Sequence, residues 1–184
     1  VANKVTIYTK KGDRGETGLL GNRRLPKTDP IFEVLGGLDQ CNALTGQAVS
    51  LMDPKGDRLL IELLEDLQRN YLAVGSCLAA EKPAEAVFLT HLPEQIKLLE
   101  EKIDEWDETL PPLRNFILPG GAPAGAVLHV ARTFVRQTER NFNRLAKVSA
   151  PELVGQYLNR LSDFYFQAAR YYNFTQKQNE KIWK

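Results

Sequence analysis

The sequence predicts an all-α protein, an up-and-down bundle of five helices of the ferritin-like or four-helix-bundle type. Apolar residues recur at helical spacing through five long segments, whereas the alternating pattern typical of strands is almost absent. A length of 184 residues is typical of one domain that buries a core without disulfides or structural metal. We therefore expect a single domain over residues 1–184, with a loop at 1–30, the bundle at 31–173 and a tail at 174–184.

The first two predicted helices flank a short turn. Apolar residues recur every three or four positions in residues 31–52, and a polar turn follows at 53–56. Asp57 stands where an N-cap would begin the second helix, whose apolar face continues to Leu78. The segment 81–83 contains a proline and is expected to end this helix.

Three further helices are expected in the second half of the chain. The third begins near Leu92 and carries its apolar face to Trp106, with acidic residues facing outward. The fourth covers about 124–147 and the fifth about 152–173. Between the third and fourth helices, residues 109–123 are rich in proline and glycine, which predicts an irregular loop.

That loop contains the apolar string Phe116-Ile117-Leu118. Apolar side chains that a proline- and glycine-rich loop exposes to solvent need a reason, because such loops often bear function.

Charge and cysteine content exclude several classes of function. Lysine and arginine total 24 against 23 aspartates and glutamates, so no overall field attracts nucleic acid or an anionic membrane. Cys41 and Cys77 lie in apolar helical patterns without metal-ligand spacing, which favours reduced core residues. No apolar run reaches about 18 residues, and a cytoplasmic protein is expected.

The N-terminal segment has glycines at three-residue spacing, at Gly12, Gly15 and Gly18, among hydroxyls and cations. Such a backbone can curl around an anion while side chains neutralise it, which suggests phosphate. The segment is neither a Walker A loop nor a dinucleotide-binding fingerprint. From composition alone, a mobile basic arm is an equally good interpretation.

The fourth and fifth predicted helices each have a mixed polar stripe. On the fourth, a polar sector is opposite a predicted core face: His129, Arg132, Arg136, Glu139 and Asn143 against Val127, Val130, Phe134, Phe142 and Leu145. On the fifth, Asn159, Asp163, Phe166 and Arg170 are opposite Leu161, Tyr165, Ala168 and Tyr172. A solvated face with pairs such as Arg136 to Glu139 is the simpler explanation for the fourth helix alone.

Metal chemistry is disfavoured by the histidines. His129 is expected to be a satisfied packing residue, because its only companion, His91, falls at a loop-helix junction. The Glu-x-x-His pairs of di-iron bundles are absent from the sequence, and no metal ligand is predicted.

Three separated blocks of the sequence resemble the PduO-type ATP:cob(I)alamin adenosyltransferases. The blocks are Tyr8-Thr9-x-x-Gly12-Asp13-x-Gly15-x-Thr17 through Lys27-x-Asp29, then Phe116-Ile117-Leu118-Pro119-Gly120-Gly121 with His129-x-Ala131-Arg132-x-x-x-Arg136-x-x-Glu139-Arg140, then Tyr157-Leu158-Asn159-Arg160-Leu161-Ser162-Asp163. Their order and spacing cover nearly the whole chain, which makes them more specific than any single block.

The resemblance implies a homotrimer that binds ATP between neighbouring subunits. The loop and the two stripes would then form the nucleotide site, through Thr9, Lys10, Lys11, Gly12, Asp13, Gly15, Thr17, Gly18, Lys27, Arg136, Glu139, Arg140 and Asn159. Arg132 would pair with Asp39 across the subunit boundary. Phe116 matches the aromatic residue that enters the corrinoid pocket and helps to displace the lower axial ligand of cobalt.

The implied reaction moves the adenosyl group of ATP onto the Co(I) of reduced cobalamin and releases triphosphate, with Mg²⁺ expected on the phosphates. Cobalt is the nucleophile, so the protein has to position the 5′ carbon and stabilise the leaving group. The implied partners are a flavoprotein reductant and an enzyme that uses adenosylcobalamin.

The sequence departs from the family pattern at two places that matter. Gln40 follows Asp39 where the family usually has Glu, and Gln137 follows Arg136 where the family has a second arginine. The fifth helix is also more polar and aromatic over residues 164–170 than is usual. These departures motivate one alternative, a non-catalytic trimer that binds ATP or carries adenosylcobalamin. A second alternative is a purely structural helical module, in which the N-terminal loop is only a basic arm.

Overall fold

The computed structural model describes residues 7–21, 23–80, 87–149 and 151–184, and it confirms the five predicted helices. Their bounds are α1 Pro30–Ser50, α2 Arg58–Ala79, α3 Leu92–Thr109, α4 Pro123–Ser149 and α5 Glu152–Thr175. The predicted end of α2 at 81–83 lies outside the described residues.

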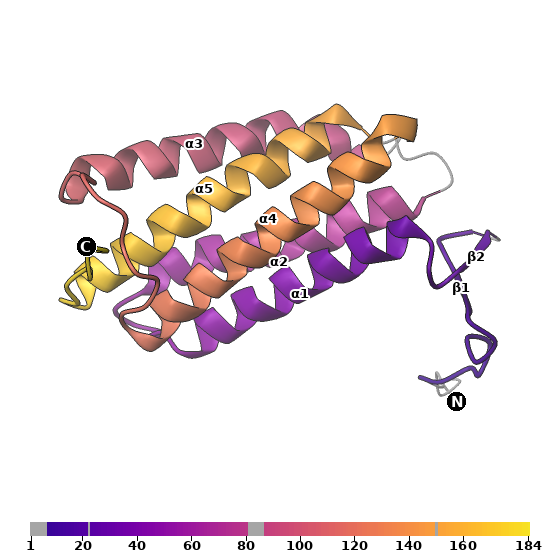
Figure 1. Cartoon of the computed structure of the whole chain (residues 1–184), viewed down its shortest axis with the longest axis horizontal. Coiled ribbons are helices and arrows are strands. Elements are labelled where there is room, and N and C mark those ends of the chain that lie inside the picture. Colours follow the sequence, from indigo (N-terminus) through magenta and orange to yellow (C-terminus); the bar gives the residue numbers. More distant parts are fainter. Residues whose placement is uncertain (1–6, 22, 81–86, 150) are drawn as a thin grey trace.

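Successive helices run in opposite directions along one bundle axis (Figure 1). Helix α4 packs between α1 and α5, α2 packs on α1, and α3 packs on α5. The N-terminal segment projects beyond one end of the bundle, whereas the α3–α4 loop and the C-terminal tail meet at the other end (Figure 1). The two functional loops suggested by the sequence therefore lie at opposite ends of the chain's own bundle.

Three short elements were not expected from the sequence. Strands β1 Glu16–Gly18 and β2 Arg24–Pro26 pair antiparallel in the N-terminal segment, with Thr17 opposite Leu25. A 3₁₀ helix, η2 Val87–His91, leads directly into α3. Three-residue strands are too short to show an alternating pattern, so this hairpin could not be predicted from the sequence.

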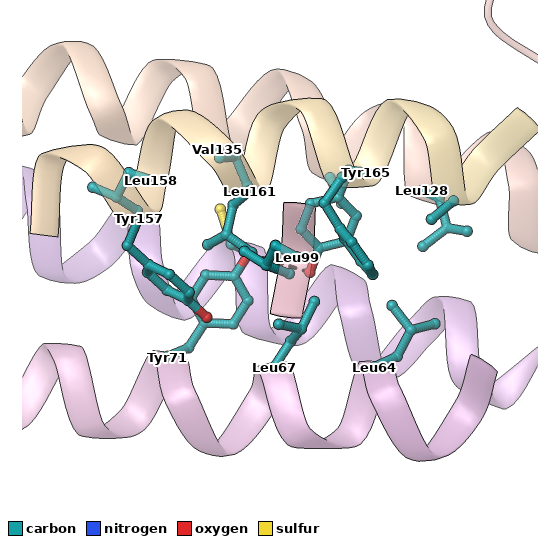
Figure 2. Packing of buried hydrophobic residues seen from close by; sticks show 14 of the residues in the cluster. Leu64, Leu67, Tyr71, Leu99, Leu128, Val135, Tyr157, Leu158, Leu161 and Tyr165 are labelled. Carbon is teal, nitrogen blue, oxygen red and sulfur yellow. Dashed lines mark hydrogen bonds between the residues drawn. The ribbon is translucent and has the colours of Figure 1, made fainter. Parts of the chain in front are cut away.

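Aromatic and hydroxyl side chains share the bundle core. Tyr71 of α2 and Tyr165 of α5 point into the space between the helices (Figure 2), and Tyr71 donates to the Tyr165 hydroxyl at 3.2 Å. The Thr45 hydroxyl lies 2.5 Å from the Tyr165 hydroxyl and donates to the Cys41 carbonyl. Burial raises the pKa of the Cys41 thiol to about 11, which makes this thiol a core group and not a nucleophile.

The predicted core face of α4 was partly wrong. Val130 is 44% exposed, whereas Phe142 is buried as expected. The buried face is centred on Leu128, Ala131 and Val135 (Figure 2 shows Leu128 and Val135). Because α4 packs between α1 and α5, its buried face points between those two helices and not along its most apolar side.

Asp57 has a different role from the one predicted. It stands at the N-cap of α2, but its side chain makes no capping bond there. Its carboxylate instead accepts a hydrogen bond from the backbone N–H of Asp53 at 2.9 Å and so closes the turn at 53–56. At the start of α1, Asp29 does cap the helix, because its Oδ1 accepts from the Ile31 N–H at 3.0 Å.

Gly37 allows α1 and α4 to approach closely, which leads to a stability prediction. A Cβ at Gly37 would lie 2.3 Å from Thr138 Oγ1, whereas a Cβ at Gly36 would meet nothing within 4 Å. Thr138 is buried and its hydroxyl donates to the Phe134 carbonyl, so it cannot simply turn away. We expect Gly37→Ala to destabilise the fold by about 1–3 kcal/mol through overpacking.

The neighbouring glycine is the matched control for this prediction. Gly36→Ala adds the same methyl group to the same helix in open space, and should stabilise the fold by about 0.4–1 kcal/mol. Urea unfolding of both variants measures the difference. Equal unfolding free energies for the two variants would contradict the close contact.

Candidate functional site

The N-terminal segment folds into a compact pair of backbone turns. Lys10 has a positive φ of 57° and Gly15 one of 82°, and the Gly15 carbonyl accepts from the Lys27 N–H at 2.8 Å. A Cβ on Gly12 would lie 3.4 Å from Lys27 Nζ, so the ammonium group lies against the turn. The structure therefore brings Lys27 to the glycine loop, as an anion cradle requires.

Arg24 closes this loop from the second strand. Its Nη2 donates to the Lys11 carbonyl at 2.8 Å and to the Glu16 carbonyl at 3.4 Å. The loop rests on its own bundle where the Leu20 N–H donates to the Ala79 carbonyl. It otherwise extends past the bundle end (Figure 1), with the side chains of Thr9, Lys10, Lys11 and Asp13 exposed.

Five polar side chains and one aromatic ring follow the boundary between α4 and α5. We call this set the α4–α5 seam, and its members are Arg132, Arg136, Glu139, Asn159, Phe166 and Arg170. At the end nearer the N-terminal segment, Asn159 Nδ2 donates to Glu139 Oε1 at 3.0 Å, so two predicted site residues meet across the helices. Arg136 and Arg140 are exposed on the same half of α4. Glu139 therefore bonds to a residue of α5. The sequence had suggested a pair with Arg136 on its own helix instead.

The middle of the seam holds positive charge close to an aromatic ring. The Arg132 guanidinium lies 5.8 Å from the centroid of Phe166, and the Arg170 guanidinium lies 5.9 Å from it. Burial, and then the positive charge of Arg136, lowers the pKa of Arg132. Arg132 Nε is buried without a hydrogen-bond partner among the described residues. A guanidinium with an unused donor, here Arg132, is suited to an anion.

His129 is buried beside the seam, 6.1 Å from Phe166 between ring centroids. Burial, and then the nearby Arg132 charge, lowers the pKa of its imidazole to about 4, so it is neutral at pH 7. The expectation of a packing residue is confirmed, but the expectation of a satisfied one is wrong, because His129 Nδ1 has no partner in the described part of the chain. No group of three metal-ligating side chains occurs among the described residues.

Asp39 lies on α1, whereas Arg132 lies on α4. Asp39 is exposed and lines a cavity of about 260 Å³ between α1 and α2, together with Asn42 and Tyr71. Asn42 Oδ1 is buried there and has no partner among the residues that the structure describes. An unused acceptor beside a carboxylate is suited to a cationic donor.

The α3–α4 loop and the tail form the far end of the site. Phe116 is 79% exposed, and its carbonyl accepts from the Trp183 N–H at 2.9 Å, while the Leu118 N–H donates to the Lys181 carbonyl at 2.7 Å. The two aromatic rings meet edge to face at 6.3 Å and line a cavity of about 500 Å³. This pairing could not be predicted from the sequence, because the tail has no helical or alternating pattern.

The two departures from the family pattern meet in space. Gln40 of α1 and Gln137 of α4 line one small groove together with Phe32 and Asn141. The two changes are therefore neighbours in the folded chain.

The described helices hold no segment that is both long enough and apolar enough to cross a bilayer.

Comparisons with known proteins agree with this geometry. The family model described as cobalamin adenosyltransferase matches residues 7–172. A mouse corrinoid adenosyltransferase, MMAB, is 37% identical over 183 residues, which cover 97% of this chain and 77% of the relative. A corrinoid adenosyltransferase from Bacillus subtilis is 39% identical over 170 residues, which cover 91% of this chain and 86% of the relative.

A solved structure has the same fold throughout. It is a variant of the PduO-type ATP:corrinoid adenosyltransferase from Lactobacillus reuteri, complexed with cobalamin and ATP. The TM-score is 0.90 at 34% sequence identity, and the match covers 97% of each chain. Family model, relatives and structure agree over nearly the full length, which confirms the resemblance seen in the three sequence blocks. The chain therefore belongs to the PduO-type cobalamin adenosyltransferase family.

Proposed function

We propose that this protein transfers the 5′-deoxyadenosyl group of ATP to the Co(I) centre of a reduced corrinoid. Co(I) supplies the electron pair for the new Co–C bond, and the C5′–O bond breaks with its electrons going to triphosphate. The observation that supports this best is the α4–α5 seam, which connects Glu139 and Asn159 with the apolar loop at Phe116. The seam offers arginine and amide groups to a nucleotide, and the loop offers an apolar surface to a corrinoid ring.

The nucleotide half of the site is proposed to be shared between subunits of a homotrimer. The N-terminal loop, with Lys27, would hold the triphosphate against Arg136 and Arg140 of a neighbouring subunit. The loop projects away from its own bundle, which supports this arrangement (Figure 1). The seam also has an unused donor at Arg132, and the α1–α2 cavity has a carboxylate and an unused acceptor, at Asp39 and Asn42.

Mg²⁺ would accompany the triphosphate and would be held mainly by phosphate oxygens. Magnesium keeps several waters and needs few protein carboxylates when phosphates are present. This fits a site in which the described residues offer arginine and lysine and no cluster of three carboxylates or histidines. A flavoprotein reductant, an acceptor enzyme for the product and a cytoplasmic location stay predictions from the sequence.

The reaction can be tested directly with purified protein. ATP and chemically reduced cobalamin, mixed with the protein without oxygen, should yield a light-sensitive adenosylated corrinoid and one triphosphate per turnover. Folded trimer that binds ATP but forms neither product would instead support the non-catalytic alternative.

Mixed oligomers test the proposal that Asp39 and Arg132 meet across a subunit boundary. Asp39→Ala and Arg132→Ala should each lose most activity when assayed alone. After co-refolding in equal amounts, about one quarter of the interfaces would combine an intact Asp39 with an intact Arg132, by random assembly of a cyclic trimer. We therefore expect recovery of about a quarter of wild-type activity, which steady-state assays at matched protein concentration can measure.

No recovery in the mixture, together with normal trimers by light scattering, would place both residues in the same subunit's site. A mixture of Asp39→Ala with an Asp39→Asn protein is the matched control, because neither component supplies an intact Asp39.

A further inference from the structure

Arg170 is a buried charge that no part of the proposed reaction uses. Its side chain is 1% exposed, and all three of its nitrogens donate hydrogen bonds. Nε donates to Glu180 Oε1 at 2.6 Å, Nη1 to Gln167 Oε1 at 3.1 Å, and Nη2 to the Pro111 carbonyl at 2.9 Å. A guanidinium with so little contact with water needs a counter-charge, and Glu180 is its ion-pair partner.

The partners of Arg170 come from two segments that are far apart in the sequence. Pro111 begins the α3–α4 loop, and Glu180 lies in the tail that follows α5. The tail turns back on α5 at Lys177, which has a positive φ of 55°, and the Gln178 N–H donates to the Asn173 carbonyl. One side chain on α5 therefore anchors both the loop and the tail.

The loop and the tail are also joined to each other next to Phe116. The Leu118 N–H donates to the tail at Lys181, and the Trp183 N–H donates to the Phe116 carbonyl. Ile117 and Ile182 form an antiparallel bridge between these two bonds. The contacts close a ring that runs from Arg170 through the tail to Phe116 and back through Pro111.

We propose that the Arg170–Glu180 ion pair is a positioning device, which fixes Phe116 by locking the tail onto the α3–α4 loop. Phe116 is 79% exposed and has few contacts of its own to hold its backbone in place. Its place is set by the tail, and the tail is held through Glu180, whose side chain is 25% exposed and whose partner Arg170 is 1% exposed. Arg170 also touches Phe166, which lies against Arg132, so the device is continuous with the α4–α5 seam.

Glu180→Gln tests the proposal by removing the charge and keeping the shape. Hydrogen exchange of the Leu118 and Trp183 amides should become at least about tenfold faster, because a buried guanidinium without its counter-charge releases the tail. Amides inside the five helices should keep their protection, which shows that the bundle is intact. Glu180→Asp keeps the charge and should restore part of the protection.

A kinetic test, which rests on the proposed function, distinguishes an effect on corrinoid use from an effect on ATP use. For Glu180→Gln, kcat/KM for reduced corrinoid should fall by about tenfold or more, while KM for ATP should stay within about twofold, since only the Phe116 end is loosened. Glu62→Gln is the matched control, because Arg58 and Glu62 form an exposed pair at 2.8 Å on α2. It should change neither measurement.

Each outcome decides the proposal. Unchanged exchange at Leu118 and Trp183 would overturn it, even if the wild-type protein had no adenosyltransferase activity, because this measurement needs no substrate. Faster exchange with wild-type corrinoid kinetics would show that the tail docks without positioning Phe116. Equal losses in Glu180→Asp and Glu180→Gln would show that the charge is not what holds the tail.

Discussion

Arg136→Ala should lower kcat/KM for ATP by about 10²- to 10³-fold, because it removes a charge-assisted fork from the departing triphosphate. Arg136 is exposed on α4, and its charge acts on Arg132 one turn away. Loss of an exposed side chain leaves no cavity, so the melting temperature should hardly change. Steady-state rates at varied ATP, with saturating reduced corrinoid, measure the effect.

Two further variants sharpen the interpretation of Arg136. Arg136→Lys keeps the charge but loses the planar fork, so it should recover only part of the lost rate. Arg144→Ala removes an equally exposed arginine about two turns further along α4 and should leave ATP kinetics unchanged. If Arg136→Ala used ATP as well as Arg144→Ala does, the triphosphate would have to bind elsewhere.

The helices could be predicted because each has a buried face of its own. Helix α2 places Leu60, Leu64 and Leu67 in the core at helical spacing, and this periodicity survives in the sequence without any knowledge of neighbours. The core face of α4 could not be predicted as well. Its orientation is set by two flanking helices, and Val130 is exposed although it is as apolar as its buried neighbours.

The candidate site was predictable where short motifs specify it and unpredictable where tertiary contacts do. Lys27 against Gly12 and Asn159 against Glu139 were both anticipated as members of one site. The role of the tail was missed. Glu180 has no motif around it, and its importance depends on the burial of Arg170, which only the packed structure shows.

Phe116→Ala should reduce turnover with corrinoid by about 10- to 100-fold while leaving ATP affinity intact, because the aromatic ring is proposed to act on the corrinoid and not on the nucleotide. Since Phe116 is 79% exposed, truncating it should cost little folding stability. The bonds that hold its backbone, to Trp183, do not involve the ring and should persist. Adenosylation rates at varied corrinoid and separate ATP titrations measure the two effects.

The matched control for Phe116 is another exposed apolar residue, one that lies on a helix and outside the α3–α4 loop. Leu59 of α2 is 82% exposed, and Leu59→Ala should change neither ATP affinity nor corrinoid turnover. Hydrogen exchange at Leu118 also distinguishes the two ways in which the corrinoid end can fail. In Phe116→Ala the Leu118 amide should stay protected while turnover falls, whereas in Glu180→Gln both should be lost together. A Phe116→Ala protein with weakened ATP binding and unimpaired corrinoid turnover would assign this loop to the nucleotide instead.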